Sequence, residues 1–170
     1  MMLGRGLAVA AAAAVLDQIS KAMVLGFFGE PGCALHRLAV SPFLDLVLTC
    51  NPGVSFGLFN RTGVNSLIFS LAALAIVLVL VIWLSRVRAS FLAAAIGLVI
   101  GGAIGNVVDR LRFGAVIDFL DFHLATWHWP AFNLADSAIC LGVAAMLLDG
   151  MLSRRAMPQA KGREDRKSVV

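Results

Sequence analysis

The chain has 170 residues, of which 60% are hydrophobic and only 14% are charged. Soluble globular domains are nearer half apolar and a quarter charged, so this composition is that of a membrane protein and excludes an ordinary soluble domain. The formal net charge of +4 could suggest a nucleic-acid partner. However, six of the 14 lysines and arginines fall in the last 17 residues, so the positive charge is mostly a property of the tail. We therefore expect no nucleic-acid partner.

Four segments are long enough to cross a membrane, which takes about 20 mainly apolar residues. They cover approximately residues 7–28, 64–84, 89–110 and 133–152. No small-x-small cleavage site precedes Asp17 and the apolar run resumes after Lys21, so the first segment is predicted to stay as a helix rather than leave as a signal peptide. Residues 1–153 are expected to form a single integral membrane domain, and residues 154–170 a disordered basic tail.

The basic residues predict the orientation, because cytoplasmic loops of membrane proteins carry an excess of lysine and arginine. With both termini inside, nine basic residues lie on the cytoplasmic side and four lie outside. The nine are Arg5, Arg86, Arg88, Arg154, Arg155, Lys161, Arg163, Arg166 and Lys167, and the four are Arg37, Arg61, Arg110 and Arg112. We therefore predict both termini, and the tail, to be cytoplasmic.

Two outer segments have an unusual composition. Residues 29–62 contain three prolines and several glycines, which disfavour a helix, and Phe43–Thr49 has the pattern of a strand. The Asn-Pro-Gly sequence at 51–53 supplies a turn, after which Val54–Phe59 is expected to return as the partner strand. A small β-rich platform is therefore predicted on the outer face. The second segment, Leu111–Phe132, has tryptophans suited to the lipid headgroup zone and is expected to be a mobile flap.

The three cysteines, Cys33, Cys50 and Cys140, show no metal-ligand spacing. Pairing of Cys33 with Cys50 requires that their segment face an oxidising compartment. A free thiol with apolar neighbours is an equally good expectation, so the pairing stays open.

Asp17 and Lys21 are charged residues inside the first apolar segment. A charge in a bilayer costs about 2.5 to 3.5 kcal/mol on insertion scales, and it therefore marks function by default. The two residues are four apart, hence on one helical face, where they can neutralise each other. A structural ion pair and a pair that contacts substrate are equally compatible with this pattern.

The third apolar segment has a stripe of small residues. Glycine recurs every four residues from Gly97 to Gly105, and Asp109 continues the stripe. Small residues at this spacing let two helices approach closely in lipid. Asn106 and Arg110 are likewise neighbours on the adjoining face. A packing seam capped by polar residues would explain this much, but not the polar cluster that follows.

That cluster contains Asp118, and later Asp136 where the fourth segment begins. Because the third helix runs outward and the fourth returns inward, both aspartates are expected at the same outer level. Two carboxyl groups near an apolar boundary do not both ionise readily, so one proton is shared. Such a pair can activate water as a base and protonate a leaving amine as an acid. The histidines follow no nucleophile motif and the glycines no phosphate-loop motif, so an aspartate pair is the sharper interpretation.

Five motifs together resemble bacterial lipoprotein signal peptidase (signal peptidase II) in order and spacing. They are DQISK at 17–21, NPGVSFG at 51–57, GGAIGNVVDR at 101–110, VIDF at 116–119 and FNLAD at 132–136. The resemblance covers roughly residues 7–152. It departs from the family pattern at Cys50, Pro52 and Val54-Ser55, where the Pro-Gly pair should still preserve the turn.

The resemblance implies an all-α membrane protein of four transmembrane helices, with an extracytoplasmic β-cradle at about 30–62 and a short periplasmic helix or flap. It implies an aspartic endopeptidase of the bacterial plasma (inner) membrane that cuts diacylglyceryl-modified prolipoproteins just before the lipobox cysteine, near the outer face. Expected partners are these substrates and membrane lipids, with a monomeric enzyme and neither cofactor nor metal.

The resemblance also implies roles for ten residues by motif. Asp118 and Asp136 would be the catalytic dyad. The residues that bind substrate or orient the dyad would be Asn51, Gly53, Asn106, Arg110 and Asn133. Asp17, Lys21 and Asp109 would be supporting polar residues.

Two other function classes stay open at this point. A small transporter would use Asp17, Lys21 and Asp109 as an ion relay. A lipid-headgroup phosphotransferase would hold Mg²⁺ between Asp118 and Asp121, although that chemistry usually needs more carboxylates. A purely structural four-helix protein leaves the outer polar residues unexplained.

Overall fold

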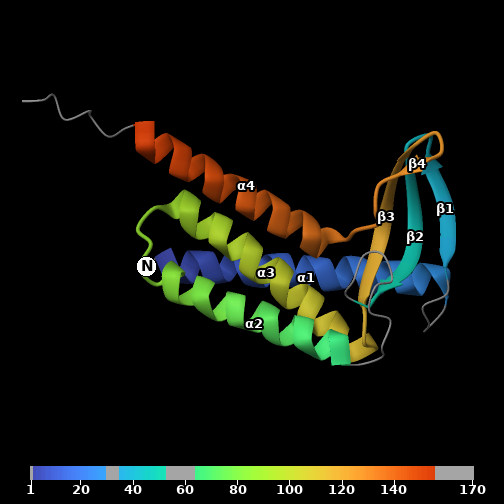
Figure 1. Cartoon of the computed structure of the whole chain (residues 1–170), viewed down its shortest axis with the longest axis horizontal. Helices are drawn as coiled ribbons and strands as arrows, with labels where there is room; N and C mark the ends of the chain where they lie inside the picture. The colour runs from blue at the N-terminus through green and yellow to red at the C-terminus, as the bar shows by residue number, and fades with distance from the viewer. Residues whose placement is uncertain (1, 30–34, 53–63, 156–170) are drawn as a thin grey trace, which may run out of the picture.

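The computed structural model describes residues 2–29, 35–52 and 64–155 of the chain. The elements of this part are α1 (Met2–Phe28), β1 (His36–Ser41), β2 (Leu44–Asn51), α2 (Val64–Leu84), α3 (Ser90–Phe113), β3 (Val116–Leu124), β4 (Trp127–His128) and α4 (Leu134–Arg155). The helices form one bundle and the strands form a sheet across one of its ends (Figure 1).

Each of the four helices is long and apolar enough to cross a membrane. The candidate spans are Met2–Phe28, Ser66–Leu84, Ser90–Phe113 and Leu134–Ser153. Their outward surfaces carry large exposed apolar side chains, for example Val15, Leu78 and Leu147. The predicted fold class of four spanning helices with a small sheet is therefore confirmed, and the chain is a multi-pass membrane protein.

Helix α3 packs against each of the other three helices. A Cβ atom on Gly101 would collide with the carbonyl oxygen of Ala10 in α1, and a Cβ atom on Gly102 with that of Ala135 in α4. The glycines thus let neighbouring backbones approach closely on two sides of α3. The seam predicted from Gly97 to Gly105 is present, and it faces α1.

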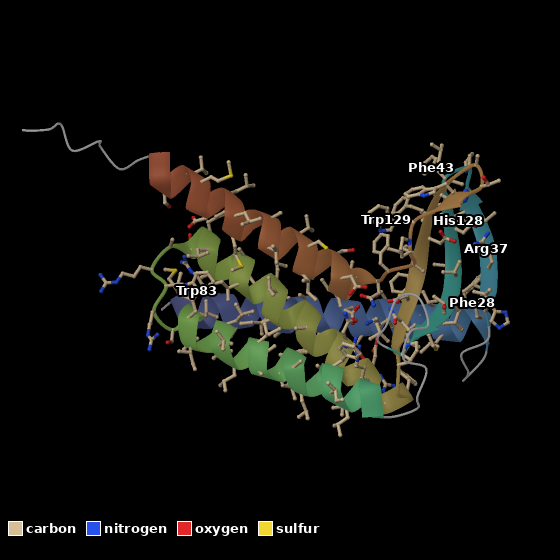
Figure 2. The ribbon with its side chains drawn as sticks, viewed as in Figure 1. Phe28, Arg37, Phe43, Trp83, His128 and Trp129 are labelled. Carbon is tan, nitrogen blue, oxygen red and sulfur yellow. The ribbon has the colours of Figure 1, made fainter. Side chains whose placement is uncertain are left out.

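The sheet and the turn that carries Arg86 and Arg88 lie at opposite ends of the bundle, and both ends carry aromatic residues. The start of α1, the end of α4 and the turn that carries Arg86 and Arg88 lie at the end opposite the sheet (Figure 1). Figure 2 shows Trp83 at that same end, whereas Phe43 and Trp129 lie at the sheet end. Aromatic residues at both ends are typical of the two water interfaces of a membrane protein.

The sheet has the order β1-β2-β3-β4 and its neighbouring strands are antiparallel. Strand β2 therefore pairs with β1 and β3. The partner strand predicted at Val54–Phe59, like the turn glycine Gly53, lies outside the described residues. A register shift falls between Leu46 and Thr49, after which Thr49 pairs with Asp118.

The segment expected to be a flap, Leu111–Phe132, is instead largely part of the sheet. Its first residues continue α3 until Gly114, whose φ of 75° ends the helix while its N–H donates to the carbonyl of Arg110 at 3.1 Å. The β-branched and aromatic residues that follow favour a strand, and they form β3. A bridge between Leu120 and Phe132 ties the end of the segment to β3. None of the described residues outside the four long helices is helical, so the short helix implied by the resemblance is not found in this part.

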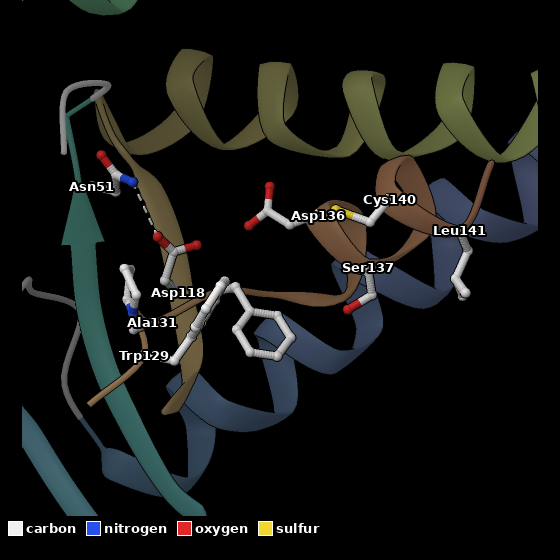
Figure 3. Close-up of a pocket in the computed structure, with 10 residues that line it drawn as sticks. Asn51, Asp118, Trp129, Ala131, Asp136, Ser137, Cys140 and Leu141 are labelled. Carbon is white, nitrogen blue, oxygen red and sulfur yellow. Dashed lines mark hydrogen bonds between the residues drawn. The ribbon is translucent and has the colours of Figure 1, made fainter. Parts of the chain in front are cut away.

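One face of the sheet packs on the last turns of α1. Val24 of α1 forms a buried apolar cluster with Leu48 of β2 and with Ile117 and Phe119 of β3. Successive side chains of a strand point to opposite faces, so Asp118, between Ile117 and Phe119, points away from this cluster. The sheet is thereby fixed with Asp118 directed toward the start of α4 (Figure 3).

The described cysteines have different states. Cys50 is disulfide-bonded. Cys140 is free and exposed on α4. Cys33, the remaining cysteine of the sequence, lies outside the described residues.

Candidate active site

Asp118 of β3 and Asp136 of α4 line the same cavity, whose volume is about 610 Å³. Figure 3 shows their carboxyl groups turned toward each other at its inner side. Asn51 also lines the cavity, and Trp129, Pro130, Ala131, Phe132, Ser137, Cys140 and Leu141 complete its walls. The two aspartates expected to meet from opposite directions along the chain thus do meet.

The sequence at the start of α4 fixes the position of Asp136. Asn133 precedes the helix, and its side-chain oxygen accepts the N–H of Asp136 at 2.9 Å. In return, the Asp136 carboxylate accepts the N–H of Asn133 at 3.3 Å. This reciprocal arrangement is a capping box, in which two otherwise unpaired backbone donors are satisfied. The carboxylate also lies in the first turn of the helix, where the helix dipole favours a negative charge.

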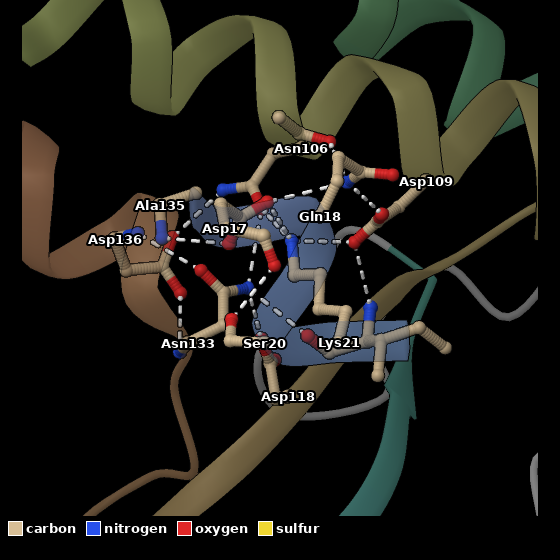
Figure 4. Close-up of polar contacts among 12 residues, drawn as sticks. Asp17, Gln18, Ser20, Lys21, Asn106, Asp109, Asp118, Asn133, Ala135 and Asp136 are labelled. Atoms are coloured by element: carbon tan, nitrogen blue, oxygen red, sulfur yellow. Dashed lines mark hydrogen bonds and ion pairs between the residues drawn. The ribbon is translucent and has the colours of Figure 1, made fainter. Parts of the chain in front are cut away.

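Three asparagines hold the two carboxyl groups: Asn106 and Asn133 are seen in Figure 4, and Asn51 in Figure 3. The amide of Asn133 donates to Asp118 at 2.7 Å and to the side-chain oxygen of Asn106 at 3.1 Å. The amide of Asn106 donates to Asp136 at 2.8 Å. Asn51 donates to the other oxygen of Asp118 at 3.3 Å. Both aspartates are therefore oriented by amide groups that lie on separate elements.

Asp118 is only 2% exposed, and its surroundings change its acidity. Burial raises the pKa of Asp118 from the ordinary 3.8 to about 7, and the nearby charge of Asp136 adds to the rise. Hydrogen bonds from Asn51 and Asn133, together with the charge of Lys21, act in the opposite direction. A carboxyl group that titrates near neutral pH beside a second carboxylate can serve as an acid.

A second polar group lies next to Asp118 and Asp136. Lys21 bridges two buried carboxylates, with its ammonium 2.8 Å from Asp17 and 2.6 Å from Asp109. The predicted Asp17–Lys21 ion pair is present, and Asp109 is a second carboxylate bound to Lys21. Gln18 joins the same carboxylates through its amide, at 3.2 Å to Asp17 and 2.8 Å to Asp109. Nothing in the sequence beyond its place in the DQISK motif indicated this role for Gln18.

Arg110 lies at the edge of this group. Its guanidinium donates to the backbone carbonyl of Asn106 at 3.3 Å and lies 6.0 Å from the ring centroid of Phe69. Within the described part of the chain its buried Nε has no hydrogen-bond partner, and no carboxylate forms an ion pair with it. Gly53, the other residue expected to bind substrate, lies outside the described residues.

Asp121 belongs to a different group, which we call the sheet cluster: Arg37, Asp45, Asp121, His123 and His128. Asp45 and Asp121 are directly opposite each other in β2 and β3. Arg37 contacts both, at 3.4 Å and 2.8 Å, while His123 lies 3.2 Å from Asp45 and His128 lies 3.0 Å from Asp121. Since Asp118 and Asp121 have separate partners, the geometry does not support the phosphotransferase alternative.

The ion-relay alternative also finds no support in the contacts. Asp17, Lys21 and Asp109 are bound to one another and to neighbouring amides. In residues 2–29, 35–52 and 64–155, no group of three or more His, Cys, Asp or Glu residues is arranged to hold a metal ion.

Comparison with known proteins identifies the family. A family model described as Signal peptidase (SPase) II matches residues 9–152. The chain belongs to the signal peptidase II family. Members of this family are proteases that remove the signal peptide from prolipoproteins, and as a member this chain is an aspartic protease of that kind.

Relatives of similar length support the membership. The chain is 39% identical over 156 residues to the lipoprotein signal peptidase of Methylorubrum extorquens, covering 91% of this chain and 88% of the relative. It is 42% identical over 154 residues to that of Rhodopseudomonas palustris, covering 88% and 91%. A bacterial membrane enzyme solved by the in meso method at 2.3 Å has a similar structure, with a TM-score of 0.72, 26% identity and coverage of 98% and 95%. The family assignment made from the five motifs is thus confirmed.

Proposed function

We propose that Asp118 and Asp136 are the catalytic dyad of this signal peptidase, and that it cuts a diacylglyceryl-modified prolipoprotein just before the lipobox cysteine. The observation that carries the proposal is the convergence of the two aspartates on one cavity of about 610 Å³. Asn51, Asn106, Arg110, Asn133 and the undescribed Gly53 are proposed to orient the dyad or bind the substrate backbone.

The proposed reaction uses one ionised and one protonated carboxyl group. Asp136, at the helix N-terminus, is the ionised partner and takes a proton from water as the oxygen attacks the scissile carbonyl carbon. Asp118, whose pKa is raised to about 7, donates a hydrogen bond to the developing oxyanion. When the C–N bond breaks, the proton held by Asp136 passes to the leaving amine. Asp118 is then again protonated and Asp136 again ionised.

The walls of the cavity suit a lipid-bearing peptide. Trp129, Phe132 and Leu141 supply apolar surface next to the two carboxyl groups. The cavity lies where the helices meet the sheet, at one end of the spanning bundle. The diacylglyceryl chains of a substrate would remain in the bilayer beside the helices, so the membrane itself would present the scissile bond at the height of the dyad.

The proposed location is the bacterial inner membrane, with both termini in the cytoplasm and the cavity near the outer face. The start of α1, the end of α4 and the turn with Arg86 and Arg88 lie at the end opposite the cavity, which supports this orientation through the excess of basic residues. Membrane lipids are the proposed neighbours of the exposed apolar helix surfaces. We propose a monomer, because both aspartates and the asparagines that orient them belong to one chain, so the site needs no residue from a second copy.

The dyad is tested with Asp118→Asn and Asp136→Asn, each assayed on a purified precursor carrying the diacylglyceryl group. Each change should reduce kcat on the order of 10²- to 10⁴-fold, the usual contribution of a general acid or base. Asp149→Asn is the matched control, since Asp149 is on α4 but does not line the cavity. Cleavage at the normal rate by either dyad variant would show the assignment to be wrong.

A further inference from the structure

Lys21 is 2% exposed, yet its ammonium lies close to three side-chain oxygens (Figure 4). Its ammonium donates to Asp17 at 2.8 Å, contacts Asp109 at 2.6 Å, and donates to the side-chain oxygen of Asn106 at 3.2 Å. Each of these three acceptors also has one contact that leads to Asp118 or Asp136.

Asp17 and Asp109 hold the backbone next to each dyad residue in the same way. One oxygen of Asp17 accepts the N–H of Ala135, the residue just before Asp136, at 2.9 Å. One oxygen of Asp109 accepts the N–H of Ile117, the residue just before Asp118, at 3.2 Å. The two carboxylates that flank Lys21 thus each bind the backbone immediately ahead of one catalytic aspartate.

Asn106 provides the third connection, and this one is direct. Its side-chain oxygen faces the ammonium of Lys21, so its NH₂ group must face the other way. That NH₂ group donates to Asp136 at 2.8 Å. The ammonium of Lys21 and the amide of Asn133, which both donate to this oxygen, therefore fix which end of the Asn106 amide faces Asp136.

Stability alone is a weak reason to bury these charges. Desolvation of a buried ion pair often cancels its Coulomb attraction. The sheet cluster offers a comparison, since Arg37 also bridges two buried aspartates, Asp45 and Asp121. Arg37, however, is 51% exposed. Among the described residues, neither Asp45 nor Asp121, the two carboxylates that it binds, contacts the backbone beside Asp118 or Asp136.

We infer that Lys21 is a positioning residue of the dyad: through Asp17, Asp109 and Asn106 it sets the distance between Asp118 and Asp136 and the direction in which they face. The inference rests on the proposed dyad. Its parts come from α1 and α3 and do not line the cavity, yet they set the spacing of carboxyl groups on β3 and α4.

The test is Lys21→Met, purified in detergent and assayed on a diacylglyceryl-modified precursor peptide. Methionine keeps the length and apolar stem of lysine and removes the ammonium. We expect kcat to fall at least tenfold with KM changed less than twofold, because a misplacement of about 1 Å can cost on the order of 100-fold in rate. Arg37→Met is the matched control, and it should lower Tm while changing kcat less than twofold.

A second pair of variants separates positioning from folding. Asp109→Asn keeps an oxygen that can accept the N–H of Ile117, whereas Asp109→Leu has a similar size and keeps none. The first should retain at least a third of kcat, and the second should lose at least tenfold at unchanged KM. If Lys21→Met does not fold, this pair alone decides.

Three results would overturn the inference: a Lys21→Met enzyme with kcat within twofold of the unmodified one, a loss that appears only in KM, or equal kcat for the two Asp109 variants. Asp118→Asn distinguishes these from a failure of the proposed dyad. If Asp118→Asn is inactive and Lys21→Met is fully active, only the positioning role is wrong. If Asp118→Asn cleaves normally, the dyad assignment is wrong and the inference falls with it.

Discussion

Asn133 caps Asp136 and also donates a 2.7 Å hydrogen bond to Asp118, so one asparagine connects the two carboxyl groups. Its side-chain oxygen accepts the N–H of Asp136 in the first turn of α4, and its NH₂ group donates to Asp118. The residue that caps α4 therefore also orients Asp118. These two roles of the Asn133 side chain can be separated by substitution.

Asn133→Ser should retain the helix cap and lose the contact with Asp118, because serine is a good N-cap residue without an amide. We expect Tm close to that of the unmodified enzyme and a kcat at least tenfold lower. Asn133→Ala should lose about 1 kcal/mol of stability in addition. Thermal unfolding and turnover of the two variants check this, and equal turnover of Asn133→Ser and the unmodified enzyme would contradict it.

Removal of the buried charge at Asp118 should stabilise the protein at neutral and alkaline pH. The pKa of Asp118 is raised in the folded state from 3.8 to about 7, so between these values the folded state binds a proton that the unfolded state has lost. Stability from this group is thus complete below pH of about 4 and is lost as the pH rises to about 7.

Asp118→Asn cannot ionise, so its Tm should exceed that of the unmodified enzyme at pH 8 and approach it at pH 4. The same titration predicts that kcat of the unmodified enzyme falls as the pH rises above about 7, where Asp118 loses its proton. Thermal unfolding at several pH values provides the measurement. A stability difference that does not depend on pH would show that the titration is assigned to the wrong group.

Gly102→Ala should disturb the dyad from the opposite side of the helix interface. A Cβ atom there would collide with the carbonyl oxygen of Ala135 and approach Ile139 to 2.8 Å. We expect a stability loss of about 1 to 3 kcal/mol and a lower kcat, because the first turn of α4 must move. Gly26→Ala, where no atom lies within 4 Å of the added carbon, should leave both unchanged or slightly raise stability.

Trp129→Ala should weaken substrate binding more than catalysis. Trp129 forms part of the cavity wall and has no polar contact with either aspartate among the described side chains. We expect KM for a lipid-modified peptide to rise severalfold with kcat within about threefold, since apolar contact is lost from the bound state. Trp83→Ala, at the other end of the bundle, is the control and should affect neither constant (Figure 2).

The sequence was sufficient to predict the helices, because each is a local run of apolar residues. The meeting of Asp118 and Asp136 was predicted as well, since helices that run in alternate directions bring the end of one and the start of the next to a common level. The capping box follows from residues only three apart and was in principle readable from Asn133 and Asp136.

Strand β3 was missed because both of its faces are covered over the first four residues, from Val116 to Phe119, so polar and apolar residues do not alternate there. The contact of Asp17 with Ala135 joins residues 118 positions apart, and that of Arg37 with Asp121 joins residues 84 apart. Such contacts depend on register and on tertiary packing, which no local pattern specifies.

The share of buried residues differs sharply among the helices: 67% of the most apolar window of α3 is buried, against 22% for α2. Helix α3 is therefore packed like the core of a soluble protein, and size and shape should restrict the residue at each position. Most of the α2 surface faces outward and needs only to stay apolar. Homologues should therefore differ in which apolar residues they have in α2, while keeping the glycines of α3. In a saturation mutagenesis experiment, α2, the most apolar span, should tolerate many more substitutions than α3, the helix with the most glycines.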